Sequence, residues 1–355
     1  MTVRAWAELL RVSALFTVPG DALAGAAATG RRPDRGTALA VGASLCLYEA
    51  GMALNDWADR DEDAVDRPHR PIPSGRIAPG AALAAAGALT AAGLGLAARA
   101  GRPALAVATG LAATVWAYDL RLKHTPAGPA AMAAARGLDL LLGATATGAA
   151  KRAVSTGSRT GSGSRTTSGS SAAWGSGSRT GSASASNSRG FVRAALPAAG
   201  LLGAHTYAVT AVSRHEAQGG STTAPLAALA ATAALGAAAL REQRGPGDAT
   251  LDAGRGRKGE SHRSHRPPAT SASTATRLLL TALTGAYFRT AAGPLLHAAL
   301  NPSPPLTQRA VGGGIRAMIP LQAALAARAG AAGSGLAVMG LVPLARTLAR
   351  KVSLT

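Results

Sequence analysis

An all-α bundle of membrane-spanning helices is the fold that this sequence of 355 residues predicts. The first observation behind this prediction is composition: apolar residues make up 47% of the chain and aromatic residues only 3%, while Ala, Leu, Gly and Val form the bulk. Small residues of this kind let helices approach one another closely inside lipid. The second observation is that apolar stretches close to the length that crosses a bilayer, about 20 residues, recur along the chain.

Ten such stretches follow one another, so we expect nine or ten transmembrane helices in an integral membrane protein. The first is expected to be a retained helix that runs on past Pro19, where Asp21 is either a paired intramembrane acid or the mark of a bend. The ninth is the least regular, because two arginines and a glutamine interrupt it. The approximate boundaries of the ten are 8–29, 37–55, 79–99, 103–118, 129–150, 191–212, 222–240, 276–299, 308–327 and 333–349.

Two polar stretches interrupt the apolar pattern. Residues 151–190 are rich in Ser, Gly, Thr and Arg, and residues 242–275 mix Gly, Pro, Arg, His and Thr. Neither can bury a core, so we expect a single membrane domain over residues 1–355 that two disordered insertions interrupt. The insertions supply much of the net charge of +20. Because no aromatic interleaving or nucleic-acid motif accompanies this charge, it does not indicate nucleic-acid binding.

The segment from Asn55 to Gly75 crowds six acids at the end of an apolar stretch. If the preceding helix continues, Asn55, Asp59 and Asp63 lie at positions i, i+4 and i+8, and Asp56 joins them from i+1. Like charges one turn apart destabilise a helix unless they are neutralised. A set of carboxylate and amide oxygens, without Cys or His at matching spacing, favours Mg²⁺. The alternative is a solvated acidic loop balanced by neighbouring arginines.

A rigid basic turn follows the acids directly. It reads Arg-Pro-His-Arg-Pro-Ile-Pro-Ser-Gly and starts at Arg67, with its second arginine at Arg70. Such a turn is suited to hold an anion beside a metal. Together the two runs resemble the first signature of the UbiA superfamily of intramembrane prenyltransferases, Asn-Asp-x-x-Asp-x-x-x-Asp followed by Arg-Pro-x-Arg-Pro.

This resemblance implies a UbiA-like helical bundle and roles for the matching residues. Asn55, Asp56, Asp59 and Asp63 would bind Mg²⁺, and Asp59 and Asp63 would be essential for catalysis. The two arginines of the basic turn would contact the diphosphate of an isoprenyl substrate.

Further matches follow the fourth stretch. Tyr118 and Lys123 match a family Tyr and Lys, with a spacing one residue looser, which implies contact with the diphosphate and a catalytic part for Lys123. On the residues alone this segment is equally typical of an interfacial anchor. Arg136, in the fifth stretch, fits a family arginine and implies one more diphosphate contact, whereas Asp139 departs from the usual Asn. Arg136 and Asp139, at i and i+3, are able to neutralise each other in lipid.

The resemblance is weakest after the sixth stretch, where UbiA proteins carry a second acidic motif. This chain offers a single carboxylate there, Glu216, two residues after Arg214. Glu216 would ligate a second metal with help from substrate and water, or Arg214 would replace that ion against the diphosphate. The alternative is that both are ordinary polar residues at a helix end.

Alternate threading of the ten stretches places the acidic segment, the loops at 119–128 and 213–221 and both termini on one face of the membrane. Outside the two insertions, Lys and Arg are more frequent on that face, which favours a cytoplasmic location for it.

The implied activity is Mg²⁺-dependent transfer of an isoprenyl group from an allylic isoprenyl diphosphate to an aromatic or otherwise lipophilic acceptor within the membrane. The expected partners are therefore these two substrates and membrane lipid, and no nucleic acid. Two alternatives stay open. One is a non-catalytic protein that binds or transports lipids or isoprenoids on the same scaffold, because the second acidic motif is incomplete. The other is a solute transporter, whose acids would be expected at the bilayer midplane.

Overall fold

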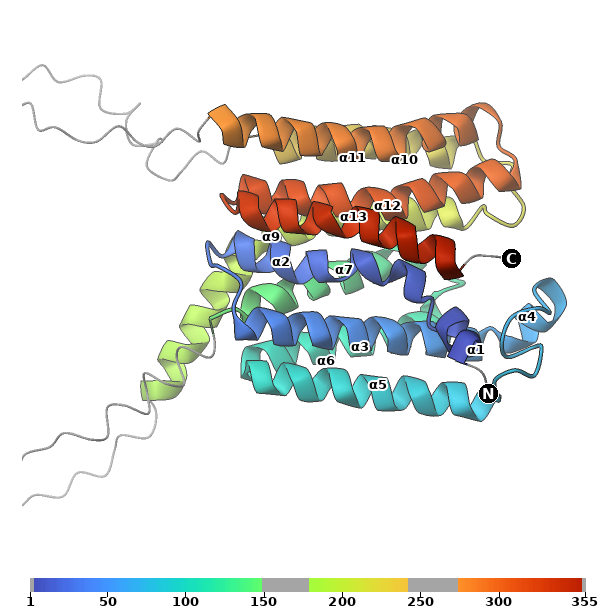
Figure 1. The fold of residues 1–355 in the computed structure, drawn as a ribbon, viewed down its shortest axis with the longest axis horizontal. Coiled ribbons are helices and arrows are strands. Elements are labelled where there is room, and N and C mark those ends of the chain that lie inside the picture. Colours follow the sequence, from blue (N-terminus) through green and yellow to red (C-terminus); the bar gives the residue numbers. More distant parts are fainter. Residues whose placement is uncertain (1–2, 149–178, 242–273, 353–355) are drawn as a thin grey trace, which may run out of the picture.

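The computed structural model describes residues 3–148, 179–241 and 274–352, and its described secondary structure is helical throughout (Figure 1). Two short irregular turns, the 3₁₀ turn η1 and the π turn η2, interrupt the helices. The elements are α1 (Val3–Leu9), η1 (Val12–Thr17), α2 (Pro19–Ala28), α3 (Arg35–Ala58), α4 (Arg60–Asp66), α5 (Pro79–Ala100), α6 (Arg102–Ala117), η2 (Tyr118–Leu122), α7 (Gly128–Ala146), α9 (Arg179–Ser213), α10 (Thr223–Leu240), α11 (Thr274–Leu300), α12 (Pro304–Arg328) and α13 (Ala332–Val352).

The all-α membrane bundle is confirmed. Five of the described helices are long and apolar enough to cross a bilayer: α3, the part of α9 from Arg189, α5, α10 and α12. Each of the ten predicted stretches contains helix, but the expected number of nine or ten crossings stays a prediction.

The first predicted stretch is wrong as a single helix. It is divided into the end of α1, η1 and α2, with Arg11 in a left-handed conformation (φ 50°) between the first two. Pro19 then opens α2, as its fixed φ favours at a first helical position. Asp21, in the first turn of α2, is fully buried.

The predicted range of the first insertion, 151–190, includes residues that belong to a helix. α9 already begins at Arg179, so residues 179–190 are helical. The remainder of that insertion from 151, and nearly all of the second, lie outside the described residues.

Small residues bring the helices into close contact. A Cβ on Gly143 of α7 would lie 2.4 Å from the Cα of Ala22, and a Cβ on Gly25 of α2 would lie 2.1 Å from the carbonyl oxygen of Leu140. The backbones of α2 and α7 therefore touch without intervening side chains. This packing is the use of Gly and Ala that the composition predicted.

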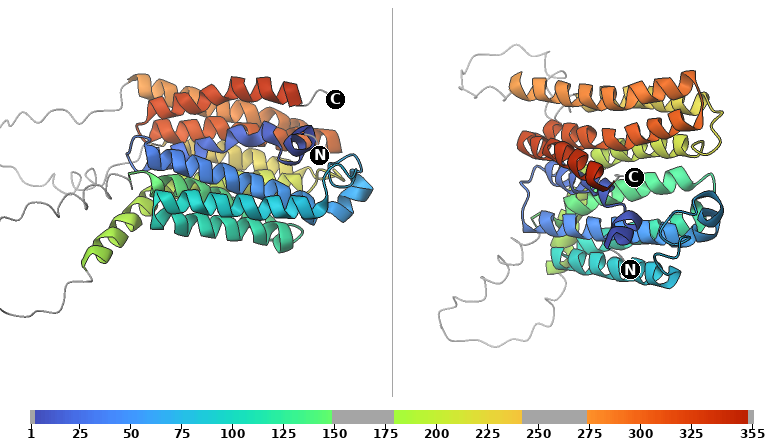
Figure 2. Two further views of the ribbon diagram at one scale, coloured as in Figure 1. Left: turned by 60° about the horizontal axis from the view of Figure 1, so that its bottom comes forward. Right: turned by 45° about the vertical axis from the view of Figure 1, so that its right-hand side comes forward.

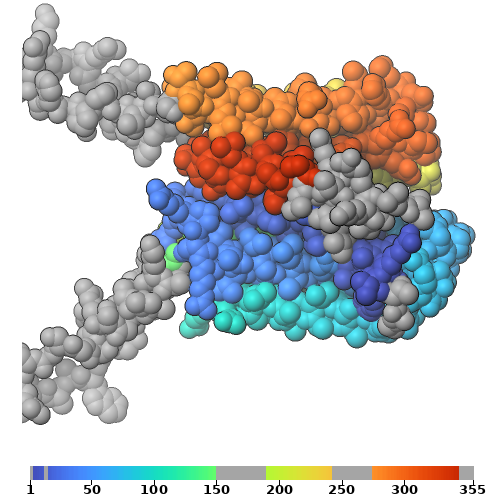
Figure 3. Space-filling view, in the orientation of Figure 1, coloured from blue at the N-terminus to red at the C-terminus, as the bar shows by residue number. Residues whose placement is uncertain are grey.

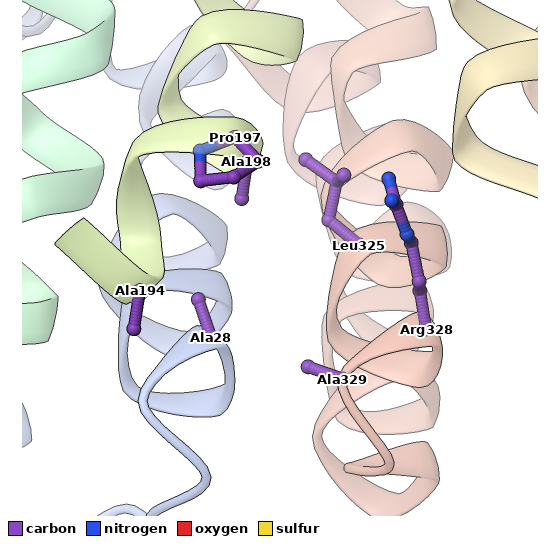
Figure 4. A pocket seen from close by; sticks show the side chains of 7 residues that line it. All are labelled: Ala28, Ala194, Pro197, Ala198, Leu325, Arg328 and Ala329. Carbon is purple, nitrogen blue, oxygen red and sulfur yellow. The ribbon is translucent and has the colours of Figure 1, made fainter. Parts of the chain in front are cut away.

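The helices lie nearly parallel to one long axis, so that the bundle has two ends (Figures 1 and 2). α1, α4 and the end of α13 lie at one end, where the space-filling view shows the N-terminal segments and α4 side by side (Figure 3). A hollow of about 40 Å³ lies at the opposite end between α2, α9 and α12, with Arg328 extended along α12 across from Pro197 (Figure 4). The candidate site is at the first of these ends.

Candidate active site

The acids of the first motif lie at the junction of two helices, because α3 ends and α4 begins on either side of Asp59. Although α3 ends at Ala58, the helical bonding pattern continues through the turn: the Asp59 amide donates to the Asn55 carbonyl (2.9 Å) and the Asp63 amide to the Asp59 carbonyl (2.8 Å). Asp56, Asp59 and Asp63 are all buried. The cluster therefore lies against the bundle rather than in a solvated loop.

Basic side chains from the basic turn and from the end of η2 neutralise these acids. Arg70 of the basic turn lies 2.6 Å from Asp63 and 3.4 Å from Asp56. Arg67 approaches Asp63 at 3.3 Å, one helical turn away. Lys123, from the end of η2, makes a very close ion pair with Asp59. The structure thus brings the basic turn and Lys123 to the acids, as the family resemblance implied.

Arg11 belongs to this cluster, although the sequence did not identify it. Its guanidinium lies 3.1 Å from Asp56 and donates to the Asn55 amide oxygen at 3.4 Å. A non-glycine residue at positive φ is strained and is over-represented at functional sites. The only available signal was a charge beside an apolar stretch, which is also common at a helix end.

The π turn η2 explains the loose spacing between Tyr118 and Lys123. The Lys123 amide donates to the Tyr118 carbonyl five residues earlier (2.9 Å), so both residues lie on nearly the same side of the helix despite the extra residue. Such bulges are frequent at functional sites. Between them, Asp119 accepts a bond from the Asn55 side-chain nitrogen at 3.2 Å, and burial raises the pKa of this carboxyl to about 7.

The segment after α9 reaches the same end of the bundle. Arg214 donates to the Thr125 carbonyl (3.2 Å), which joins it to the loop that carries Lys123. Burial raises the pKa of Glu216, while the nearby positive charges of Arg67 and Arg11 act in the opposite direction. Glu216 therefore faces the cluster of the first motif.

A second arrangement of metal-ligating atoms overlaps the first. One ligand atom each of Asp59, Glu62 and His124 lie within 4.8 Å of one another. Oxygen ligands without histidine were expected because no histidine has a matching spacing along the chain. The fold nevertheless brings His124 close from another segment. Glu62 and His124 are exposed, however, whereas Asp56 and Asp63 are buried beside the basic residues.

A cavity of about 400 Å³ extends from this cluster into the bundle. Arg11, Asn55, Tyr118, Asp119 and Glu216 line one end, which we call the mouth. Apolar side chains of α3, α6, α7, α9 and α12 line its middle, among them Leu47, Leu111, Met132, Val209 and Met318. The cavity is therefore polar where the charges gather and apolar below them.

Arg136 lies apart from the mouth. It makes an ion pair of 2.5 Å with Asp21, which also accepts a bond from Gln322 (2.8 Å). Asp139 accepts a short hydrogen bond from Ser44. The expected pairing of Arg136 with Asp139 is thus replaced by a pair between α7 and α2, because Asp21 approaches from a neighbouring helix that i, i+3 spacing cannot reveal.

Comparison with known proteins identifies the same family that the sequence motifs resemble. The UbiA prenyltransferase family matches residues 13–241. The digeranylgeranylglyceryl phosphate synthase of Methanopyrus kandleri is 38% identical over 129 residues, which are 35% of this chain and 46% of the relative. That of Methanothrix thermoacetophila is 42% identical over 109 residues, or 30% of this chain and 41% of the relative. The matched segment thus spans less than half the length of these relatives.

Solved structures resemble the whole bundle. A digeranylgeranylglyceryl phosphate synthase structure has a TM-score of 0.52 at 15% identity and covers 92% of this chain and 98% of its own. A UbiA homologue from Archaeoglobus fulgidus, bound to GPP and Mg²⁺, has a TM-score of 0.50 at 17% identity and covers 95% of this chain and 99% of its own. At these identities the likeness concerns the fold.

Proposed function

Since this chain belongs to the UbiA prenyltransferase family, we propose that it transfers an isoprenyl group from an allylic isoprenyl diphosphate to an acceptor within the membrane. The observation that carries this proposal is the mouth of the cavity of about 400 Å³, where buried acids and basic side chains meet above apolar walls. A diphosphate suits the charged mouth, and a hydrocarbon group suits the walls below it.

The donor set suits Mg²⁺. Asn55 lines the mouth, Asp56, Asp59 and Asp63 are buried beside it, and Glu216 adds a carboxylate to the mouth from the segment after α9. Mg²⁺ prefers such ligands and commonly takes further ones from phosphate and water. When bound, it would supply positive charge to a departing diphosphate.

The basic residues would stabilise the same negative charge. Lys123, Arg67 and Arg70 now neutralise carboxylates that a metal would otherwise occupy, so each is near enough to turn to a diphosphate. Tyr118, Arg214 and the newly identified Arg11 complete the set around the mouth. In a site of low dielectric, each contact with developing charge lowers the activation free energy by several kcal/mol. Removal of one comparable donor by mutagenesis costs about 3 kcal/mol.

The reaction needs no redox partner. The bond between the allylic carbon and the diphosphate oxygen breaks, and its electron pair leaves with the diphosphate. A lone pair or π pair of the acceptor then forms the new bond to carbon, and the proton that the acceptor loses leaves with the diphosphate at the mouth. The apolar walls exclude water, which would otherwise capture the cation.

The role of Arg136 in this proposal differs from the diphosphate contact that the family resemblance implied. Because it is paired with Asp21 deeper in the bundle, we do not include it among the residues that contact the diphosphate. The mouth itself we assign to the cytoplasmic face, from the distribution of Lys and Arg outside the insertions.

A non-catalytic isoprenoid-binding protein is the second candidate, and the observation in its favour is that Glu216 is the single carboxylate of the second motif region. The names of the relatives refer to a glyceryl phosphate product, but the acceptor of this chain is not assigned from a match over a third of its length.

One experiment separates the two candidates. Membranes that contain the protein are incubated with labelled isoprenyl diphosphates of several chain lengths and Mg²⁺, and both pyrophosphate release and labelled lipid products are measured. The proposal predicts both. Binding of the labelled diphosphates without pyrophosphate release in any membrane extract would favour the binding protein.

A further inference from the structure

A second polar cluster closes the deep end of the cavity, and the reaction at the mouth does not use it. We call it the polar floor: Asp21, Ser44, Arg136, Asp139 and Gln322. Ser44, Arg136 and Asp139 line the cavity directly, while Asp21 pairs with Arg136 from behind and Gln322 bonds to Asp21. Asp21 and Gln322 are fully buried, and Asp139 nearly so.

Helix geometry gives the depth of this floor. Ser44 and Asn55 line the same cavity from α3 and are eleven residues apart, which corresponds to about 16 Å along the axis. On α9, Thr206 and Ser213 also line it and are about 10 Å apart along the axis, and Glu216 follows beyond the end of that helix. Beyond the floor, α2 and α7 meet at Gly25 and Gly143 with backbone against backbone. The cavity therefore ends at these polar groups.

The chemistry of the floor is unsuited to hydrocarbon. Among the described residues, the two carboxylates of the floor share one guanidinium, that of Arg136. Asp21 pairs with Arg136 and is itself held by Gln322, so Asp139 and Ser44 are not required for that pairing. Ser44 and Asp139 bond to each other, but a hydroxyl and a carboxylate can each accept further hydrogen bonds. A hydrocarbon pressed against them would leave that capacity unused, whereas a hydroxyl group would form additional hydrogen bonds.

The direction of the proposed reaction decides which substrate reaches the floor. The diphosphate departs toward the mouth, so the allylic carbon lies just below it. The acceptor must approach that carbon from the side away from the departing group, which is the interior of the cavity. The acceptor therefore lies between the reacting carbon and the polar floor.

We propose that the polar floor binds the end of the acceptor that is remote from its reacting atom, and that this end carries a hydroxyl group. The inference rests on the proposed prenyl transfer. It defines the acceptor as a molecule with a nucleophilic atom at one end and a neutral hydrogen-bond donor at the other. A carboxylate in the second position is disfavoured, because it would meet Asp139 with Asp21 close behind.

The test uses two phenols that share one nucleophile. The full chain in lipid nanodiscs is loaded with Mg²⁺ and geranyl S-thiolodiphosphate, an unreactive analogue, and binding of 4-(hydroxymethyl)phenol and 4-ethylphenol is titrated. We expect the parent protein to prefer the hydroxymethyl compound about tenfold, since a polar site loses a hydrogen bond to the ethyl group. Asp139→Leu should bring the ratio near one.

Two further variants control the result. Met132→Leu changes an apolar lining residue above the floor, and the preference should persist. Ser44→Ala keeps all charges and should reduce the preference partly, which serves if Asp139→Leu does not fold.

Binding of the analogue tests the proposed function separately from the role of the floor. If geranyl S-thiolodiphosphate does not bind to the protein in the presence of Mg²⁺, the proposed function and the inference both fail. If the analogue binds but the parent protein shows no preference for the hydroxymethyl compound, or binds neither phenol, the floor does not bind an acceptor hydroxyl. A preference that survives in both Asp139→Leu and Ser44→Ala would overturn the inference as well.

Discussion

The cavity has a charged cluster at each end, and the two are built differently. At the mouth, buried carboxylates pair with basic side chains that keep contact with solvent: Arg67 is 47% exposed and Lys123 23%. At the floor, Arg136 is 13% exposed and Asp21 not at all, and each has fixed partners from other helices. The mouth can exchange its partners for a metal and a diphosphate, whereas the floor cannot exchange Arg136 without leaving a buried charge unpaired.

The reaction is therefore assigned to the mouth. The floor is assigned the binding of the acceptor and a fixed ion pair that stabilises the fold. An ion pair near the surface contributes little stability, because solvent screens it. Removal of one partner from a buried pair is costly. Substitutions at the two ends should differ in kind, and the following outcomes would sharpen or break that distinction.

The largest effect is expected at the mouth. Asp59→Ala with Asp63→Ala should lower the rate of pyrophosphate release by at least about 10³-fold, because the proposed metal loses two ligands. The folded fraction, measured by size-exclusion chromatography and circular dichroism, should be retained. Asp61→Ala is the control, since Asp61 is exposed and pairs only with Arg60 among the described ion pairs. Equal loss in the control would contradict the assignment.

At the floor, the expected loss is of stability. Arg136→Leu leaves Asp21 buried without its cation and should destabilise the protein by about 3 kcal/mol. Asp21→Asn in the same chain should recover much of this, because the uncompensated charge is gone. Thermal unfolding in detergent measures both. A single variant as stable as the parent would show that the floor is no fixed pair.

Lys123→Met should act on substrate binding rather than on folding. Its ammonium pairs with Asp59 in this structure and would contact the diphosphate during the reaction, so kcat/KM should fall roughly 10- to 100-fold. Arg121→Met, an exposed basic residue on the same turn, provides the matched control. The assignment fails if both variants lose activity to the same degree.

The smallest effects concern the region after α9. Glu216→Gln should raise the Mg²⁺ concentration for half-maximal rate, whereas Arg214→Ala should weaken diphosphate binding at saturating Mg²⁺, because a guanidinium contacts phosphate directly. Initial rates over a matrix of Mg²⁺ and substrate concentrations distinguish the two. Wild-type behaviour of both variants would remove this segment from the site.

The parts of the site that were predictable are local. Helical spacing was enough to expect Asn55, Asp59 and Asp63 close together, and the family resemblance was enough to expect Arg70 and Lys123 near them. Ion pairs between distant segments were not predictable, because spacing along the chain carries no information about which helices become neighbours. Arg11 meets Asp56 across 45 residues, and Arg136 meets Asp21 across 115.

The fold shows the same division. Long apolar stretches predicted helices from α3 onward, since a backbone in lipid must satisfy its own hydrogen bonds. The break at Arg11 was missed, because its cause is tertiary: Arg11 turns toward the acids. A bend near Pro19 was one of the two alternatives for Asp21, and the start of α2 there brings Asp21 to Arg136.

The most direct measurement of the central claim is Mg²⁺-dependent binding of labelled geranyl diphosphate to the protein in nanodiscs. The account predicts saturable binding that rises with Mg²⁺, is lost in EDTA, and is lost in the Asp59→Ala, Asp63→Ala variant while Asp61→Ala binds like the parent. Equal binding with and without Mg²⁺, or undiminished binding by the double variant, would show that the mouth of the cavity is not a metal-assisted diphosphate site.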